Sequence, residues 1–343
     1  MMKLEAASIR FVLLFSVFVA SGQAQAEVPF NAPPGFRAEK VHRAFKGTGT
    51  EFDWLKVSDD HLALYLFDLD QNSGFSKKVK KKYRQNLVKY GAKAMEWSHT
   101  LGTFNEWLLA SGVDFLDHSL KQEPVQMVID PMVDRVETNL SFEFMALEPE
   151  VRTQWWVKAW IEPVDDQDFQ FGYVPVVIHE LGHFIFHSSL NKAGRLRLKD
   201  EQFVRLTLAP VDEAFADVVS YEFTHEPLVG KRYDYDLKKV VEFRRSLSST
   251  SLAREKVRKG NWPYKQMGVN DHETGAPFRD VLIEIGEDYG NCAIFEVIRA
   301  IQLRLTDPSS PLMDPHVMLF SELNQAFNTA IAEELSRYPR LGK

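Results

Sequence analysis

The 343-residue chain has 41 Lys and Arg against 48 Asp and Glu, which gives a formal net charge of −7, and 45% of its residues are hydrophobic. This mild acidity argues against nucleic acid as a general partner, and a single cysteine, Cys292, excludes a disulfide within the chain. The length suits one two-lobed domain or two small ones.

Residues 1–26 are typical of a secretory signal peptide. Lys3 and Arg10 flank the start of an apolar run at residues 11–20, and a small-x-small cleavage site ends at Ala26. The apolar run is too short for a stable membrane span, and no later stretch is long and apolar enough to cross a bilayer. The sequence therefore predicts cleavage after Ala26 and a secreted or periplasmic protein.

The part of the chain that follows is predicted to carry a helical region and then strands. Residues 27–50 are rich in Pro, Gly and charge, and we expect an extended lead-in there. One or two helices are predicted for residues 76–107, where a basic run at the start favours a solvated face over a membrane-binding surface. Three strand-like runs rich in β-branched or aromatic residues follow, at residues 125–129, 139–146 and 155–161.

Two features of this region have alternative interpretations. The run at residues 139–146 is either an ordinary sheet strand or an edge strand that pairs with an extended substrate backbone. The three aspartates Asp165, Asp166 and Asp168 favour a solvated acidic turn, with a Ca2+ site as the alternative.

Residues 179–183 read His-Glu-Leu-Gly-His within an apolar stretch, which predicts a helix that is buried on most sides. On this helix His179 and His183 share a face, so both imidazoles can reach one metal ion. Glu180 lies one step round, where it can touch a metal-bound water without occupying the metal. Buried histidine and glutamate side chains are costly unless they are paired or bind a metal, so the stretch predicts a metal site.

The third ligand is expected on a second helix. His187 is a poor candidate, because it lies about 12 Å along the helix axis from His179. Residues 208–223 predict another helix with a proline near its start and acids in its first turn. In that helix Glu213 can complete a His2Glu site with one open position, and Asp217 can orient a histidine ligand. An exposed acidic first turn is the alternative for both acids.

With HELGH at 179–183 and VDEAFADVV at 211–219, the chain resembles the gluzincin metallopeptidases, and most closely their thermolysin-like branch. The segment Asn-Asp-His-Glu-Thr-Gly at residues 270–275 resembles the one that brings a transition-state histidine into the cleft, with one residue fewer between histidine and glycine. Residues 276–312 look like the closing helices of that family. The resemblance covers roughly residues 120–343.

The resemblance implies a role for each candidate residue. Zn2+ would be held by His179, His183 and Glu213, and it would lower the pKa of its bound water toward neutrality. Glu180 would take a proton from that water and deliver it to the leaving amine.

Two further residues have supporting roles in this scheme. Asp217 would accept a hydrogen bond from the outer nitrogen of His179, and His272 would donate to the oxyanion of the transition state. The family commonly has a tyrosine between the HExxH helix and the third ligand, and this chain has none there; the substitutes available are Tyr221, Tyr233, Tyr235 and Tyr264.

The fold implied by the resemblance is α+β, a thermolysin-like arrangement of two lobes. Residues 27–200 would form an N-terminal lobe with helices, a small mixed sheet and the HExxH helix. Residues 201–343 would form a mainly helical C-terminal lobe that carries the third zinc ligand. The function implied is that of an exported zinc endopeptidase acting on a peptide or protein substrate. The alternatives are an aminopeptidase and a zinc-stabilised scaffold protein that has lost turnover.

Overall fold

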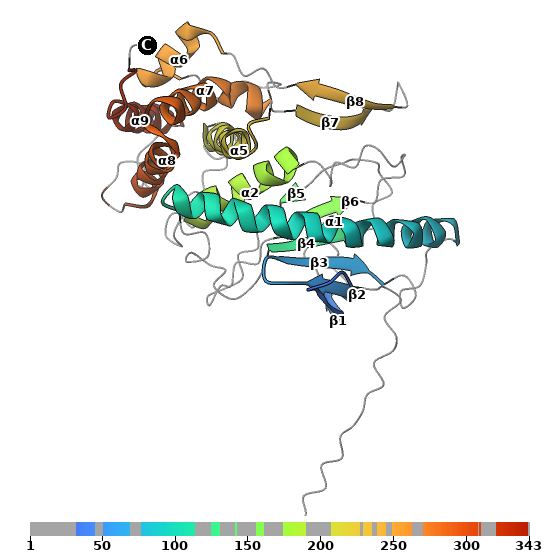
Figure 1. The fold of residues 1–343 in the computed structure, drawn as a ribbon. Helices are drawn as coiled ribbons and strands as arrows, with labels where there is room; N and C mark the ends of the chain where they lie inside the picture. Colours follow the sequence, from blue (N-terminus) through green and yellow to red (C-terminus); the bar gives the residue numbers. More distant parts are fainter. Residues whose placement is uncertain are drawn as a thin grey trace, which may run out of the picture.

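The structure, a computed structural model, describes residues 32–44, 51–68, 77–113, 125–130, 141–142, 156–160, 174–189, 207–226, 229–234, 239–244, 249–262, 270–307, 309 and 320–341. Helices and strands both occur, so the expected α+β class is confirmed. A sheet built from the first half of the chain lies on one side of the molecule, and the helices of the second half gather on the other (Figure 1).

The strands of the first half form one six-stranded mixed sheet, where the sequence predicted a small mixed sheet. Its strands, in spatial order, are β1 (Arg37–Ala44), β2 (Glu51–Ser58), β3 (Leu62–Phe67), β4 (Val125–Asp130), β6 (Trp156–Trp160) and β5 (Ser141–Phe142). The first three are antiparallel neighbours, β4 and β6 run parallel to β3, and β5 is an antiparallel edge strand.

The centre of the sheet is apolar because it is covered. Residues 62–66 in β3, Leu-Ala-Leu-Tyr-Leu, are all buried, as expected for a strand that packs on both faces. Parallel strands need a long crossover connection, and the 34-residue helix α1 (Lys77–Ala110) provides it between β3 and β4. Trp97 and Phe104 of α1 are buried in the same core as β3.

The sequence located some of these elements and missed others. The predicted strands at residues 125–129 and 155–161 correspond to β4 and β6, and the helical region is the single helix α1. Residues 37–44, placed in the lead-in, form β1 instead. This strand is rich in charged residues, and its order comes from pairing with β2 across the chain, which a local pattern does not reveal. Of the run at 139–146, residues 141–142 are described, and they form the edge strand β5.

The second half is mainly helical, with one hairpin that the sequence did not predict. Its helices are α2 (Val174–Ser189), α5 (Ala209–Thr224), α6 (Ser251–Arg258), α7 (Asp271–Tyr289), α8 (Asn291–Thr306) and α9 (Phe320–Leu335). The hairpin consists of β7 (Val229–Asp234) and β8 (Lys239–Arg244). Among the helices that the structure describes, none combines the length and apolar character needed to cross a membrane.

Helix α5 packs against α2 on one side and α7 on the other at points where only small residues fit. A Cβ atom on Gly182 of α2 would lie 2.7 Å from the Cα atom of Ala216 in α5. A Cβ atom on Gly275 of α7 would lie 2.3 Å from the carbonyl oxygen of Pro210. These two glycines therefore set how closely the three helices approach.

The polar face of α5 is the face that meets α2. At helical spacing Glu213, Ala216, Asp217 and Ser220 share one face of α5, and their contacts show that this face lies along α2. Ser220 is buried, and its hydroxyl donates a 2.7 Å hydrogen bond to the carbonyl oxygen of Pro175, near the start of α2. The two helices are thereby joined at one end by a hydrogen bond and near the middle by a glycine contact.

The substitution Gly182→Ala should destabilise the fold, because the added methyl meets backbone atoms of α5 that cannot move as a side chain does. We expect a loss of about 1–3 kcal/mol in the free energy of unfolding, measured by urea denaturation. The matched control is Gly102→Ala in α1, where the nearest atom is the Nε2 of the exposed His61 side chain at 3.3 Å. Equal unfolding free energies for the two variants would contradict this account of the helix contact.

Candidate metal centre

Helix α2 places the two histidines and the glutamate of HELGH. Its apolar residues Val177, Ile178 and Leu181 are buried, which fixes the helix in the core and sets the direction of its polar side chains. His179 is buried, while Glu180 and His183 are half-buried. The four-residue spacing therefore gives a pair of histidines on one face, as predicted.

The two histidines converge with Glu213 of α5. Glu213 Oε2 lies 3.2 Å from His179 Nε2 and 3.3 Å from His183 Nε2. The two Nε2 atoms are 3.1 Å apart. These three atoms, from the neighbouring helices α2 and α5, thus form a nearly equilateral triangle.

This triangle fits a metal ion. With zinc–ligand bonds of about 2.0–2.1 Å, the edge of a regular tetrahedron is about 3.3 Å, close to the three separations observed. Two imidazoles and a carboxylate also suit other first-row divalent ions. Among the described residues, the group whose ligand atoms lie close enough together to hold one ion is His179, Glu213 and His272. His183 therefore stays a predicted ligand, and the geometry alone does not select zinc.

Each of the two histidines has a carboxylate close to its Nδ1 atom. Asp217 Oδ1 lies 3.0 Å from His179 Nδ1, and Asp212 Oδ1 lies 2.9 Å from His183 Nδ1. Acceptors at Nδ1 fix the tautomer that leaves Nε2 free to bind an ion. Asp217 was singled out in the sequence for this position. Asp212 was not, although it lies beside Glu213, and its approach to His183 became visible only when α5 was placed against α2.

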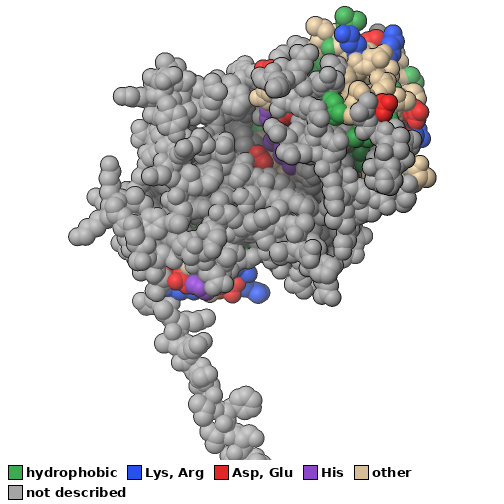
Figure 2. Space-filling model, turned by 180° about the vertical axis from the view of Figure 1, so that it is seen from behind, with side chains coloured by type: hydrophobic (Ala, Val, Ile, Leu, Met, Phe, Trp, Pro, Cys, Tyr) green, Lys and Arg blue, Asp and Glu red, His purple; other side chains and the backbone are tan. Residues whose placement is uncertain are grey.

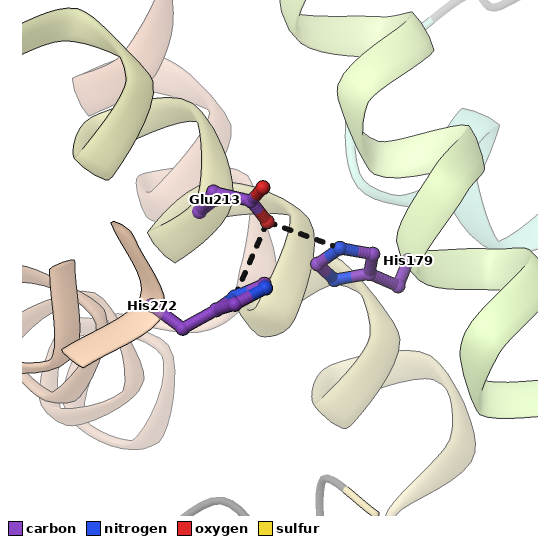
Figure 3. A group of neighbouring side chains, drawn as sticks. All are labelled: His179, Glu213 and His272. Carbon is purple, nitrogen blue, oxygen red and sulfur yellow. Dashed lines mark ion pairs between the residues drawn. The ribbon is translucent and has the colours of Figure 1, made fainter. Parts of the chain in front are cut away.

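His272 joins the group from the first turn of α7. The side chain of Asn270 caps this helix by accepting a hydrogen bond from His272 N at 3.0 Å. His272 Nδ1 lies 3.2 Å from Glu213 Oε2 and 3.6 Å from Asp217 Oδ2. Figure 3 shows the Glu213 carboxylate between the rings of His179 and His272. The three residues His179, Glu213 and His272 have ligand atoms within 4.8 Å of one another.

The centre is partly open to solvent. The side chains of Glu213 and His272 are 25% and 19% exposed. In the space-filling view, histidine and acidic side chains are visible within a recess of the surface (Figure 2).

Electrostatics hold the metal-free centre together. Burial by itself would lower the pKa of His179, but hydrogen bonding with Asp217 and Glu213 outweighs it and raises this pKa. Burial likewise opposes the charged form of His183, and Asp212 and Glu213 raise its pKa well above 6.5. Burial would raise the pKa of Glu213, yet its hydrogen bonds with His179 and His183 lower it far below 4.5. The neighbouring acids thus favour the protonated forms of the two histidines when no metal ion is bound.

A buried arginine lies behind Asp217. Arg279 of α7 is 1% exposed, and its Nη1 atom is 3.6 Å from Asp217 Oδ2. The sequence did not identify this residue, because its link to the centre depends on the packing of α7 against α5.

The remaining candidates lie elsewhere or outside the described residues. His187 lies in the last turn of α2, away from the first histidine as predicted. Tyr221 of α5 lies eight residues after Glu213, about 12 Å along the helix axis, and Tyr233 lies in β7. The other residues fall outside the part that the structure describes: Tyr235, Tyr264, Asp165, Asp166, Asp168 and the whole predicted signal peptide.

Removing Glu213 should weaken metal binding strongly. We expect Glu213→Ala to raise the Zn2+ dissociation constant more than about 100-fold, beyond the roughly 10–100-fold that loss of an outer partner costs. The measurement is competition with a chromophoric chelator. Glu226→Gln, at an exposed position just after α5, is the control and should bind as the wild type does. Unchanged affinity in Glu213→Ala would rule out this ligand.

The stability of the metal-free protein should depend on pH in two opposite ways. The pKa values of His179 and His183 are raised in the folded state. Their contribution to the free energy of unfolding is therefore complete below about pH 6.5 and is lost as the pH rises through the raised pKa values. The pKa of Glu213 is lowered in the folded state, so the contribution of Glu213 to the free energy of unfolding is present above about pH 4.5 and is lost as the pH falls. Urea unfolding with a chelator present should therefore show a maximum between these limits.

Zn2+ should abolish the decline in the free energy of unfolding above about pH 6.5. The ion takes the place of the histidine protons, and it binds more tightly as the histidines lose those protons. The same unfolding series with saturating Zn2+ tests this. A metal-free profile that stays flat from pH 6 to 9 would contradict the assignment of raised histidine pKa values.

Comparison with known proteins provides no family for the chain. No protein-family model matches its sequence, and no curated protein matches it. Function is therefore inferred from the residues of this centre and their geometry.

Proposed function

We propose that the chain is an exported zinc-dependent metallopeptidase that hydrolyses peptide bonds with Glu180 as general base. The observation that supports this most is the convergence of His179 Nε2, His183 Nε2 and Glu213 Oε2 at 3.1–3.3 Å from one another. Membership of the gluzincin group belongs to the same proposal, as does a thermolysin-like division into lobes at residues 27–200 and 201–343. Export depends on residues 1–26.

Zinc is the ion we propose, held by two imidazoles and one carboxylate. Three protein ligands with one open position are the usual arrangement of a catalytic zinc site. When bound, the ion would polarise the substrate carbonyl and make water a stronger nucleophile near neutral pH. Asp217 and Asp212 keep His179 and His183 in the tautomer that presents Nε2 to the ion.

Glu180 is the proposed proton carrier. It follows His179 directly on α2 and is half-buried, and it is not one of the three converging ligand atoms. As general base it accepts a proton from the attacking water, and as general acid it returns that proton to the leaving amide nitrogen.

His272 is the proposed oxyanion donor. Its Nδ1 atom faces Glu213 and Asp217, so its Nε2 atom, on the opposite side of the ring, is the one that faces a substrate. A donor in this position stabilises the negative charge that develops on the carbonyl oxygen. This role accounts for a histidine that the capped start of α7 holds beside the ligands.

A peptide is the proposed substrate because an edge strand lies beside the active-site helix. Among the residues that the structure describes, β5 is the last strand of the sheet, pairs with β6 and contacts α2 (Figure 1). An extended peptide can add to such an edge through main-chain hydrogen bonds. This would bring its backbone close to His179 and Glu180.

A second candidate function follows from the position of His272. Its Nδ1 atom is 3.2 Å from Glu213 Oε2 and belongs to the group that could hold an ion. If His272 is a fourth protein ligand, the coordination is closed, as in structural zinc sites. The chain would then be a metal-stabilised binding or scaffold protein without turnover.

Peptide cleavage by the purified mature protein distinguishes these functions. The wild type should cut a peptide library in a chelator-sensitive way, and Glu180→Gln should lower kcat by about 10²–10⁴-fold without changing Zn2+ affinity. Glu226→Gln is the control for a neutral glutamine substitution. Cut positions within the peptides indicate an endopeptidase, and cuts after the first residue indicate an aminopeptidase. Stoichiometric Zn2+ with no cleavage would reject the peptidase in favour of the scaffold.

A further inference from the structure

An ion pair of neighbouring residues lies buried behind the centre. Arg279 and Asp280 follow each other on α7, and they are only 1% and 4% exposed. Burying charged groups is costly unless each is paired and hydrogen-bonded. The pair contributes no atom to the triangle of ligands, so the proposed chemistry does not by itself explain it.

The contacts of the guanidinium are divided between two carboxylates. Its Nε and Nη2 atoms lie 3.1 Å and 3.0 Å from Asp280 Oδ1, and its Nη1 atom lies 3.6 Å from Asp217 Oδ2. Asp280 uses its other oxygen, Oδ2, to accept a hydrogen bond from Ser249 N, and Arg254 Nη1 lies 3.9 Å from that oxygen. Asp280 therefore orients one edge of the guanidinium and leaves the remaining nitrogen to face Asp217.

Asp217 needs such a partner. It is 0% exposed, so water does not compensate its charge, and its Oδ1 atom is engaged with His179 Nδ1 at 3.0 Å. The positive charge of Arg279 offsets this negative charge on the side of Oδ2. Stability alone is a weak reason for burying these charges, because apolar residues often replace a buried ion pair without loss.

We propose that Arg279, held in place by Asp280, is a positioning residue for the metal centre: it orients Asp217, which in turn fixes His179. Arg279 acts through another residue and is buried away from substrate. The inference rests on the metal-binding part of the proposed function and not on peptide cleavage.

A double-mutant cycle on the full chain tests this, with the Zn2+ dissociation constant as the measurement. Asp217→Asn should weaken binding about 10–100-fold, as loss of an outer partner does. Arg279→Gln should weaken it about 10-fold, since it removes the residue that orients that partner. Combined with Asp217→Asn, the arginine substitution should add less than about 2-fold, because residues that act through one contact are not additive.

Asp280→Asn should weaken Zn2+ binding in the same direction as Arg279→Gln. The matched control is Arg304→Gln, which removes a half-exposed arginine from its contacts with Glu333 and Glu334 at 2.9 Å and 3.1 Å. It should leave Zn2+ affinity unchanged. If Arg279→Gln does not fold, as judged by circular dichroism, Arg279→Lys takes its place in the cycle.

Three results would overturn the proposal. The first is a wild-type Zn2+ dissociation constant in the folded Arg279 and Asp280 variants, and the second is a double variant in which the two single losses of Zn2+ affinity multiply. The third is a loss of fold in all of these variants that Zn2+ does not reverse. A wild type that binds Zn2+ without cleaving peptides would reject the peptidase and leave the cycle to decide on Arg279. A wild type that binds no Zn2+ would reject both.

Discussion

The close packing of α5 between α2 and α7 is the constraint on which the centre depends. Gly182 and Gly275 let the three helices approach to distances at which a methyl group would meet backbone atoms. Only at that separation can Glu213 of α5 reach both histidines of α2 and His272 of α7 with one oxygen atom. The sheet and α1 supply the core against which α2 is fixed, and α5 then carries the charged side chains to it.

The electrostatic design follows from this packing. Three carboxylates lie beside the two histidines, and behind Asp217 lies the buried pair of Arg279 and Asp280, so each charge depends on a neighbour: Asp212, Glu213, Asp217, Arg279 and Asp280. The neighbouring acids raise the pKa values of His179 and His183. When no metal ion is bound, protonated histidines therefore balance the negative charge of these acids. A divalent ion would replace those protons, and the affinity of the centre for metal and the stability of the fold are therefore linked.

The two sides of the centre differ in how strongly they constrain function. On the metal side, each of the two proposed histidine ligands has a carboxylate beside its Nδ1 atom, Asp217 for His179 and Asp212 for His183. On the substrate side, His272 is close enough either to serve an oxyanion or to become a ligand itself. The number of protein ligands thus decides between a hydrolase with an open position and a closed, structural site.

The sequence by itself determined the α+β class, the helix that carries His179 and His183, and the face of a second helix that carries Glu213 and Asp217, because helical spacing and apolar burial are local properties. It did not reveal β1, whose order comes from pairing with β2, or the roles of Asp212 and Arg279. Only the tertiary structure decided those, since a carboxylate or a guanidinium gains its partner when separate helices pack together. Spacing along the chain specifies which side chains share a face, and the approach of one helix to another decides which atoms meet.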